Sequence, residues 1–344
     1  MNDASSIAAR RQIALWLFGV SALVFAMVIV GGLTRLTESG LSITEWKPVM
    51  GALPPMSEAA WQDAFRKYQQ IPQYEIVNKG MSLGDFKSIF WWEWSHRLLG
   101  RLIGFAFALP FLWFLVMRKS ERRLAPQLAV MFVLGGAQGA LGWWMVESGL
   151  STRIDVSQYR LVAHLGLATA IYAFMLWVAL GLWSARAMPA VSGALRKSAL
   201  ALVPLVYAQM MLGGFVAGLK AGYIYNTWPR IDGAFVPSGL FAQMPWWRNF
   251  FESALTAQFD HRMVAYAVAL FVGWHWLAVR RSGSVEAMQS ATWLALAVLG
   301  QVCLGIWALL EVVPVPLGAA HQAGAMIVFT LAIVHARRLN APAI

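Results

Sequence analysis

The chain has 344 residues and a formal net charge of +11; 59% of its residues are hydrophobic and only 12% are charged. Charged residues make up about 25% of an ordinary soluble domain, so this composition excludes a water-soluble protein and indicates a bilayer protein. The basic excess lies mainly in one alternate set of loops, which is typical of membrane topology, and a nucleic-acid-binding function is therefore excluded.

Eight segments are apolar over roughly 20 residues, the length that crosses the hydrocarbon core of a membrane. Lipid offers backbone amides no hydrogen-bond partner, so each segment is expected to be an α-helix. In chain order the segments cover residues 13–32, 95–117, 125–145, 159–183, 200–217, 259–279, 291–310 and 317–336. We therefore predict an all-α membrane protein with eight transmembrane helices.

The long loop between the first two segments, residues 33–90, contains the sequence SEAAWQDAFRKYQQ. This sequence predicts a short helix with Ser57 at its N-cap. Trp61, Phe65 and Tyr68 recur at helical spacing and form an apolar stripe that would fit the membrane surface.

The distribution of basic residues predicts the orientation, because Lys and Arg accumulate in short cytoplasmic loops. One set of loops and ends is strongly basic, whereas the opposite set is nearly neutral, so we expect both termini in the cytoplasm. The N-terminus resembles neither a cleavable signal peptide nor a long presequence, which favours a bacterial inner membrane. The basic residues on the predicted cytoplasmic side are Arg10, Arg11, Arg118, Lys119, Arg122, Arg123, Arg186, Arg196, Lys197, Arg280, Arg281, Arg337 and Arg338.

Four landmarks occur in the same order in each half of the chain, which indicates a tandem duplication. We predict two pseudo-symmetric four-helix bundles, residues 1–190 and 191–344. A third copy of one landmark, Gln209-x-x-Leu212-Gly213, is interpreted as a chance match, because short matches are common in apolar sequence. The paired landmarks are Gly31-Gly32 with Gly213-Gly214, His96-Arg97 with His261-Arg262, Gln138-x-x-Leu141-Gly142 with Gln301-x-x-Leu304-Gly305, and Ala163-His164 with Ala320-His321.

Four histidines, His96, His164, His261 and His321, lie near the start of an apolar segment that runs inward. They are therefore expected at one depth, in the outer half of the membrane. A histidine inside a spanning helix is costly without a partner and indicates a functional site. Imidazoles from two facing helices can hold a heme iron from both sides, so we predict two bis-histidine heme sites. The alternative is a histidine that is hydrogen-bonded to a neighbouring helix.

Two further histidines, His275 and His335, each follow a candidate ligand by about four helical turns, on the same face and deeper in the membrane. This spacing would suit a second, inner heme. The aligned positions in the first half are Pro110 and Val178, which cannot bind iron. The role of His275 and His335 therefore stays open.

Glu93 breaks the symmetry between the halves, because the aligned residue before His261 is Gln258. A carboxylate one turn from His96 can accept a proton or balance a positive charge. The alternative is an ion pair with Arg97 or Arg101. The asymmetry suggests that the first half performs chemistry and the second transfers electrons.

Arg97 and Arg262 each follow a candidate ligand histidine near the outer interface. A guanidinium pairs well with a carboxylate, so both are candidates to bind heme propionates. The alternative is that each side chain extends toward the interface.

Sequence motifs along nearly the whole chain resemble the heme A synthase family, in its proteobacterial and mitochondrial branch. Some bacterial relatives carry a cysteine pair in outward loops; here the single cysteine, Cys303, lies in the seventh apolar segment. A mechanism that needs a loop disulfide is thus excluded. The motifs are GGLTR followed by LTESGLSITEWKPVMGALPP, EWSHRLLGR, AHLGLA, AGLKAGYIYNTWPRIDG, FDHRM and AAHQAGAM.

The resemblance implies that the C8 methyl group of heme O is oxidised to a formyl group, giving heme A for terminal oxidases, by two successive hydroxylations. It implies that His96 and His164 bind the substrate heme, with Glu93 at the reacting edge, and that His261 and His321 hold a permanent heme B that relays electrons. Heme O synthase and an unidentified electron donor are the expected partners.

The second large outward loop, residues 218–258, carries YIYNTWPRIDG and MPWWRNFF. We expect these segments to cover the heme sites; for Trp246 and Trp247, anchoring at the membrane interface is an equal alternative. Two other classes compete with the enzyme. An electron-transfer cytochrome b would need the histidines but not Glu93, and a transporter would not explain four histidines at one depth.

Overall fold

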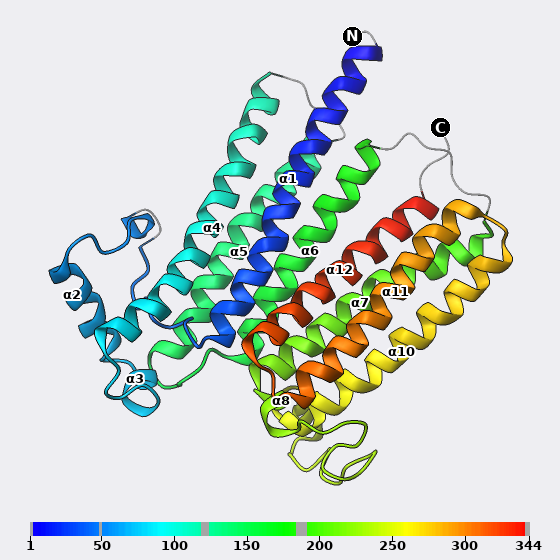
Figure 1. The fold of residues 1–344 in the computed structure, drawn as a ribbon. Coiled ribbons are helices and arrows are strands. Elements are labelled where there is room, and N and C mark those ends of the chain that lie inside the picture. Colours follow the sequence, from blue (N-terminus) through cyan, green and yellow to red (C-terminus); the bar gives the residue numbers. More distant parts are fainter. Residues whose placement is uncertain (1–2, 48–49, 118–123, 184–190, 341–344) are drawn as a thin grey trace. The chain divides into compact units, whose positions relative to one another are not determined.

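A computed structural model describes residues 3–47, 50–117, 124–183 and 191–340, and most of these residues are helical (Figure 1). Within the described ranges, eight helices are long and apolar enough to cross a membrane, which confirms the predicted number of spans. They are α1 (Asp3–Leu36), α4 (Leu83–Val116), α5 (Ala125–Leu150), α6 (Gln158–Trp183), α7 (Gly193–Gly218), α10 (Ala254–Arg281), α11 (Val285–Leu310) and α12 (Val315–Leu339).

Several spanning helices begin earlier than their apolar segments, because a polar first turn precedes the apolar run. The largest difference is in α4, which begins twelve residues before the predicted start at Ser95. Ser82 caps this helix: its side chain accepts a hydrogen bond from Asp85 N, and the Asp85 carboxylate accepts one from Ser82 N. Such a capping box satisfies backbone donors at a helix start. Ser192 and Ser284 cap the starts of α7 and α11 in a similar way.

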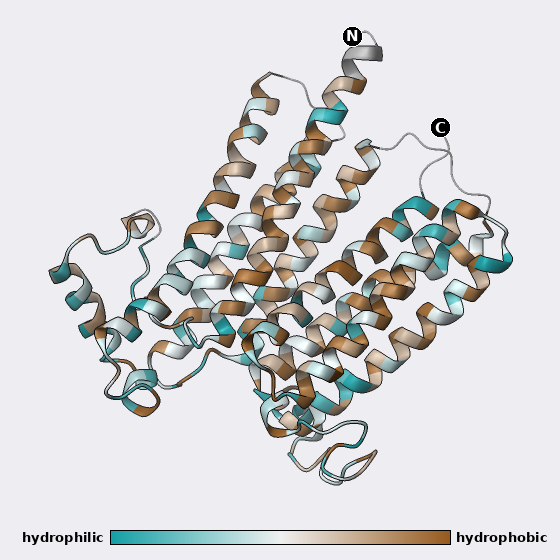
Figure 2. Ribbon diagram, in the orientation of Figure 1, coloured by the Kyte–Doolittle hydropathy of each residue, from teal (hydrophilic) through white to brown (hydrophobic). Residues whose placement is uncertain are grey.

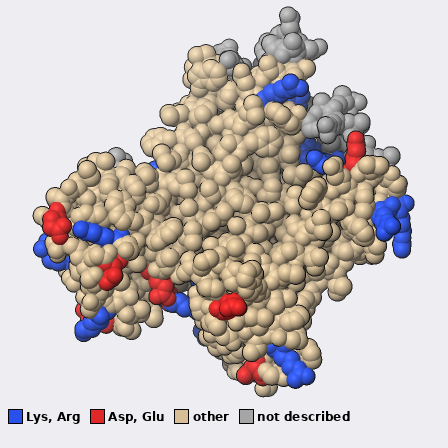
Figure 3. Space-filling model, in the orientation of Figure 1, with Lys and Arg blue, Asp and Glu red and all other residues tan. Residues whose placement is uncertain are grey.

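The outer faces of the spanning helices are apolar, as expected for contact with lipid. On α4, Leu102, Phe105, Leu109 and Leu112 recur at helical spacing and are all at least half exposed. Figure 2 shows hydrophobic residues along the whole length of these helices. On the face drawn in Figure 3, charged side chains are sparse and most of the surface is uncharged. A water-soluble protein would not expose such surfaces.

One compact unit comprises residues 22–171, which include the C-terminal part of α1 (residues 22–36), all of α4 and α5, and the first half of α6. The loop between α1 and α4 adds η1 (Met50–Ala52), α2 (Glu58–Tyr68) and α3 (Pro72–Ile76). The predicted N-cap of α2 is confirmed, because the Ser57 side chain accepts a hydrogen bond from Ala60 N.

The expected membrane-facing stripe on α2 is wrong. Trp61, Phe65 and Tyr68 are buried, and they pack with Phe86 and Phe90 in the N-terminal extension of α4. The sequence pattern placed the stripe on one helical face, but it did not show that α4 begins early enough to cover that face. This cluster therefore anchors the long loop against the N-terminal end of α4.

The other compact unit comprises residues 1–21 and 172–344. Its helices α7, α10, α11 and α12 lie side by side, and each contacts two of the others (Figure 1). The loop between α7 and α10 contains α8 (Ala221–Ile224), η2 (Trp246–Arg248) and α9 (Asn249–Glu252). The described residues form no β structure except one isolated bridge between Ile231 and Ala234.

Three predictions about organisation remain predictions. The boundary between residues 190 and 191 adjoins a range outside the described residues. The cytoplasmic position of the termini depends partly on Arg118, Lys119, Arg122, Arg123 and Arg186, which also lie outside the described residues. The orientation of the helices in the membrane rests on the charge pattern alone.

Candidate functional site

Each of the four candidate histidines lies against a glycine of the spanning helix that precedes its own. A side chain at Gly31 or Gly305 would collide with the imidazole, and one at Gly142 or Gly213 would press tightly against it, so glycine favours the close approach. The four pairs, with the distance from a Cβ placed on the glycine to the imidazole Cε1, are Gly31 and His96 (2.8 Å), Gly142 and His164 (3.0 Å), Gly213 and His261 (3.1 Å), and Gly305 and His321 (2.6 Å).

The histidines form two pairs, as the sequence predicts. The imidazoles of His96 and His164 lie close enough that a charge on one would act on the other, and the same holds for His261 and His321. All four side chains are partly exposed. Two imidazoles that face each other beside glycine-lined helix surfaces suit a flat ligand that lies between them. A heme with two histidine ligands has this geometry.

Three of the four histidines are each contacted by a glutamine on the neighbouring helix. In each case its Nε2 lies 3.1 Å from the imidazole Nδ1 and also donates to the backbone carbonyl of the same histidine. The pairs are Gln138 with His164, Gln209 with His261, and Gln301 with His321.

The interpretation of the motif around Gln209 as a chance match is wrong. Gln209 precedes Gly213 by one helical turn, so both face the same imidazole, as Gln138 and Gly142 do on α5. The signal was present in the sequence, but the contact with His261 gives it meaning. The alternative reading of these histidines, a hydrogen bond to a neighbouring helix, also holds for three of them.

His96 is the exception. Met27 occupies the place on α1 that a glutamine takes on α5, α7 and α11, one turn before Gly31. The His96 Nδ1 atom is buried and has no hydrogen-bond partner among the residues that the structure describes. The Met27 methyl group lies near Gly100, 3.0 Å from where a Cβ of that residue would be. The surroundings of the four histidines are therefore not equivalent.

Glu93 is almost completely buried in the N-terminal part of α4, with 2% of its surface exposed. One carboxylate oxygen accepts hydrogen bonds from Ser42 Oγ and Ile43 N, both at 2.8 Å. The other accepts from Arg97 Nε at 3.0 Å and Nη2 at 2.6 Å. Of the two suggested ion pairs, the structure contains the one with Arg97.

Arg97 and Arg262 occupy equivalent places and make the same kind of contact. Arg97 Nη2 donates to the carbonyl of Ile43 at 2.7 Å, and Arg262 Nη2 donates to the carbonyl of Tyr225 at 3.2 Å. Ile43 and Tyr225 follow Gly31 and Gly213 by the same number of residues, so the duplication preserves this link between helix and loop. Neither guanidinium simply extends to the interface.

The loop between α7 and α10 contacts the N-terminal part of α10 through its YIYNTWPRIDG segment; that the segment covers the heme sites stays a prediction. Gln258 Nε2 donates to Tyr225 O, and Trp228 Nε1 donates to Tyr266 Oη. In the MPWWRNFF segment, Trp246 and Trp247 are about half exposed, which agrees with their alternative as interface anchors.

His275 and His335 face each other directly, with 2.8 Å between their Nε2 atoms. Their Nδ1 atoms are hydrogen-bonded to Ser198 and Ser290, also at 2.8 Å, and both histidines are buried. An iron between two imidazoles needs about 2 Å on each side, so this arrangement excludes the suggested inner heme. The four side chains instead join α7, α10, α11 and α12 by a continuous polar chain.

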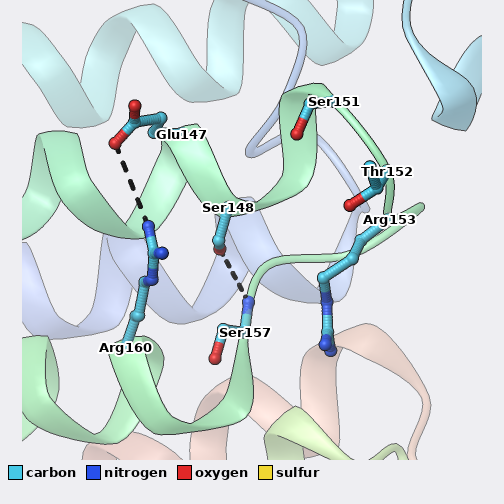
Figure 4. A pocket seen from close by; sticks show the side chains of 7 residues that line it. All are labelled: Glu147, Ser148, Ser151, Thr152, Arg153, Ser157 and Arg160. Carbon is cyan, nitrogen blue, oxygen red and sulfur yellow. Dashed lines mark hydrogen bonds and ion pairs between the residues drawn. The ribbon is translucent and has the colours of Figure 1, made fainter.

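Away from the histidines, the turn between α5 and α6 contains a polar pocket of about 380 Å³ (Figure 4). Arg160 lies 4.0 Å from Glu147, and Ser157 N donates to Ser148 Oγ at 2.9 Å. The charged groups drawn there have partners nearby: Glu147 and Arg160 contact each other, and Arg153 donates to Gln158 Oε1. None of the predicted site residues lines it.

Comparisons with known proteins identify the family of the chain. The model of the COX15-CtaA family, described as cytochrome oxidase assembly protein, matches residues 14–333. The chain belongs to the heme A synthase family. It is 62% identical over 327 residues to the heme A synthase of Parvibaculum lavamentivorans, covering 95% of this chain and 94% of that one. The heme A synthases of Nitrosospira multiformis (53%) and Rhodopseudomonas palustris strain HaA2 (51%) match over 95% and 96% of this chain, and over 93% and 91% of theirs. As a heme A synthase family member, the chain is an oxidoreductase.

Proposed function

We propose that this chain oxidises the C8 methyl group of heme O to a formyl group and so produces heme A. The observation that carries the proposal is the pair of glycine-backed imidazoles in each half, in a chain 62% identical to a heme A synthase. Two bis-histidine sites provide for one heme that is changed and one that remains.

The two sites have different roles in this proposal. His96 and His164 bind the substrate heme in a four-helix bundle formed by residues 1–190. His261 and His321 hold heme B in a second bundle, residues 191–344. Heme B, when bound, supplies electron transfer. Both sites lie in the outer half of a bacterial inner membrane, with both termini in the cytoplasm.

Glu93 is the proposed catalytic carboxylate. It lies about one turn from His96 on α4, and the second half has the uncharged Gln258 in its place. Its four hydrogen bonds fix both oxygens, so the negative charge has a defined position beside the substrate site. From there it can balance positive charge or, after a partner leaves, accept a proton.

The two arginines differ in their capacity to bind a propionate. Arg97 donates to Glu93 and to the carbonyls of Ile43 and Glu45. A propionate at Arg97 would replace one of these partners, and loss of the Glu93 contact would free a carboxylate oxygen. Arg262 makes only the long contacts to Tyr225 and Arg230, and its Nε has no partner within the described part of the chain. It therefore has a donor available for a heme B propionate.

The direct test is production of heme A in a bacterium that makes heme O but lacks its own heme A synthase. We expect extracted heme from cells expressing this chain to contain heme A, and the purified protein to contain heme B together with heme O or A. An electron-transfer cytochrome b, the competing function, would leave only heme B in the protein and no heme A in the cells. That result would reject the enzyme.

A further inference from the structure

The four histidines differ in what holds their second ring nitrogen. A histidine that binds metal through Nε2 is normally held by a polar partner at Nδ1, and removal of that partner weakens metal binding by about 10–100-fold. Gln138, Gln209 and Gln301 each place Nε2 3.1 Å from Nδ1 of their histidine. For His164 and His261 the same Nε2 also lies 3.4 and 3.5 Å from the ring Nε2, so the amide packs against the ring as well as contacting Nδ1. His96 Nδ1 has no such partner among the described residues, because Met27 stands in that place.

Each glutamine amide is itself held by the histidine that it contacts. Its Nε2 donates to the backbone carbonyl of that histidine, at 3.0 Å for Gln138, 2.9 Å for Gln209 and 2.8 Å for Gln301. This bond keeps the amide against the imidazole, and each Oε1 is buried without a partner in the described ranges. The glycine one turn further along the same helix then limits the position of the ring.

We infer that Gln138, Gln209 and Gln301 are positioning residues that fix three axial ligands, and that Met27 leaves His96 as the one ligand that releases iron readily. The inference rests on the proposed function, since it assumes that iron binds between the paired histidines. The second half then has two fixed ligands and retains its heme. The first half has one fixed ligand, His164, and one labile ligand, which allows entry of the substrate and release of the product.

The position of the labile ligand also fits the position of Glu93. Both His96 and Glu93 lie on α4. Four hydrogen bonds hold the Glu93 carboxylate, whereas His96 Nδ1 has no hydrogen-bond partner among the described residues. When His96 leaves the iron, the vacated side is the side of α4 and its fixed carboxylate. His164, on α6, keeps the macrocycle in place from the opposite side.

A reciprocal exchange of side chains tests this inference. Met and Gln are both unbranched and of similar length, so Met27→Gln and Gln209→Met alter polarity while they preserve packing. The measurement is carbon monoxide binding to the reduced, heme-loaded protein, which requires one axial ligand to leave. The first-half heme is identified as the fraction that a His164→Ala variant lacks.

In the unmodified protein we expect carbon monoxide to bind the first-half heme only. Met27→Gln should slow that binding by about 10-fold or more, and Gln209→Met should make the second-half heme reactive. Met27→Leu, the matched apolar control, should behave as the unmodified protein does. If Gln209→Met loses its heme while Gln209→Glu keeps it, the positioning role is equally supported.

Equal carbon monoxide binding to both hemes in the unmodified protein, or unchanged rates in both exchange variants, would overturn the inference. These outcomes are distinct from those for the proposed function. Heme A production with unchanged rates rejects the positioning role and leaves the enzyme assignment intact. The expected rate changes without heme A production would support the positioning role and reject the enzyme assignment.

Discussion

The guanidinium of Arg97 donates two hydrogen bonds to the carboxylate of Glu93, at 2.6 and 3.0 Å, one helical turn apart on α4. The equivalent pair in the second half, Arg262 and Gln258, has no carboxylate and instead binds a loop carbonyl, that of Tyr225, from both side chains. A duplicated structural link has thus acquired a fixed negative charge in only one half.

Glu93→Gln tests the importance of this charge. The substitution keeps the size of the side chain but removes the charge and one acceptor, so we expect heme binding to persist while heme A formation falls by roughly 100-fold or more. Extracted-heme chromatography of membranes measures both quantities. Gln258→Ala in the second half is the matched control and should retain activity; normal turnover in Glu93→Gln would remove Glu93 from the mechanism.

The glycines behind the histidines give a second prediction. In Gly305→Ala the new methyl group would lie 2.6 Å from His321 Cε1, so the ring must shift. We expect affinity for heme B to fall by about 10-fold or more, measured as heme bound per protein. Gly300→Ala on the same helix is the control, since nothing described lies within 4 Å of its Cβ position. Equal heme content in the two variants would argue against the close approach.

The buried pair His275 and His335 predicts a stability effect without loss of heme. His335→Leu leaves His275 without its 2.8 Å partner, which costs about 1–3 kcal/mol. The double variant, with both replaced by Leu, should recover part of this loss, because no buried polar group is then left unpaired at that contact. Thermal unfolding in detergent measures the difference. Loss of one heme equivalent in either variant would instead support the hypothesis of an inner heme between His275 and His335.

The spans were predictable because hydropathy and length alone identify a helix that crosses lipid. The helix starts were not, because residues such as Ser82 and Asp85 are polar and look like loop until the cap is seen. The same limit explains the error at Trp61 and Phe65. An apolar stripe shows that a face will be covered, but whether lipid or Phe86 covers it depends on the tertiary structure.

The histidines were predictable because each is polar in an apolar segment and recurs in a duplicated order. Gln209 was misjudged, because a short motif has no value until its partner, His261, is known. Met27 could not be singled out at all. An apolar residue in an apolar helix carries no signal, and its significance lies only in the missing hydrogen bond to His96 Nδ1.

The central claim is that the first half holds the heme that is changed and the second half holds the one that stays. Replacing His164 and His321 by Ala, one at a time, and identifying the hemes that remain in the purified protein tests it directly. We predict that His164→Ala retains heme B and loses heme O and heme A, whereas His321→Ala loses heme B. Loss of heme B from His164→Ala, or its retention in full by His321→Ala, would contradict the account.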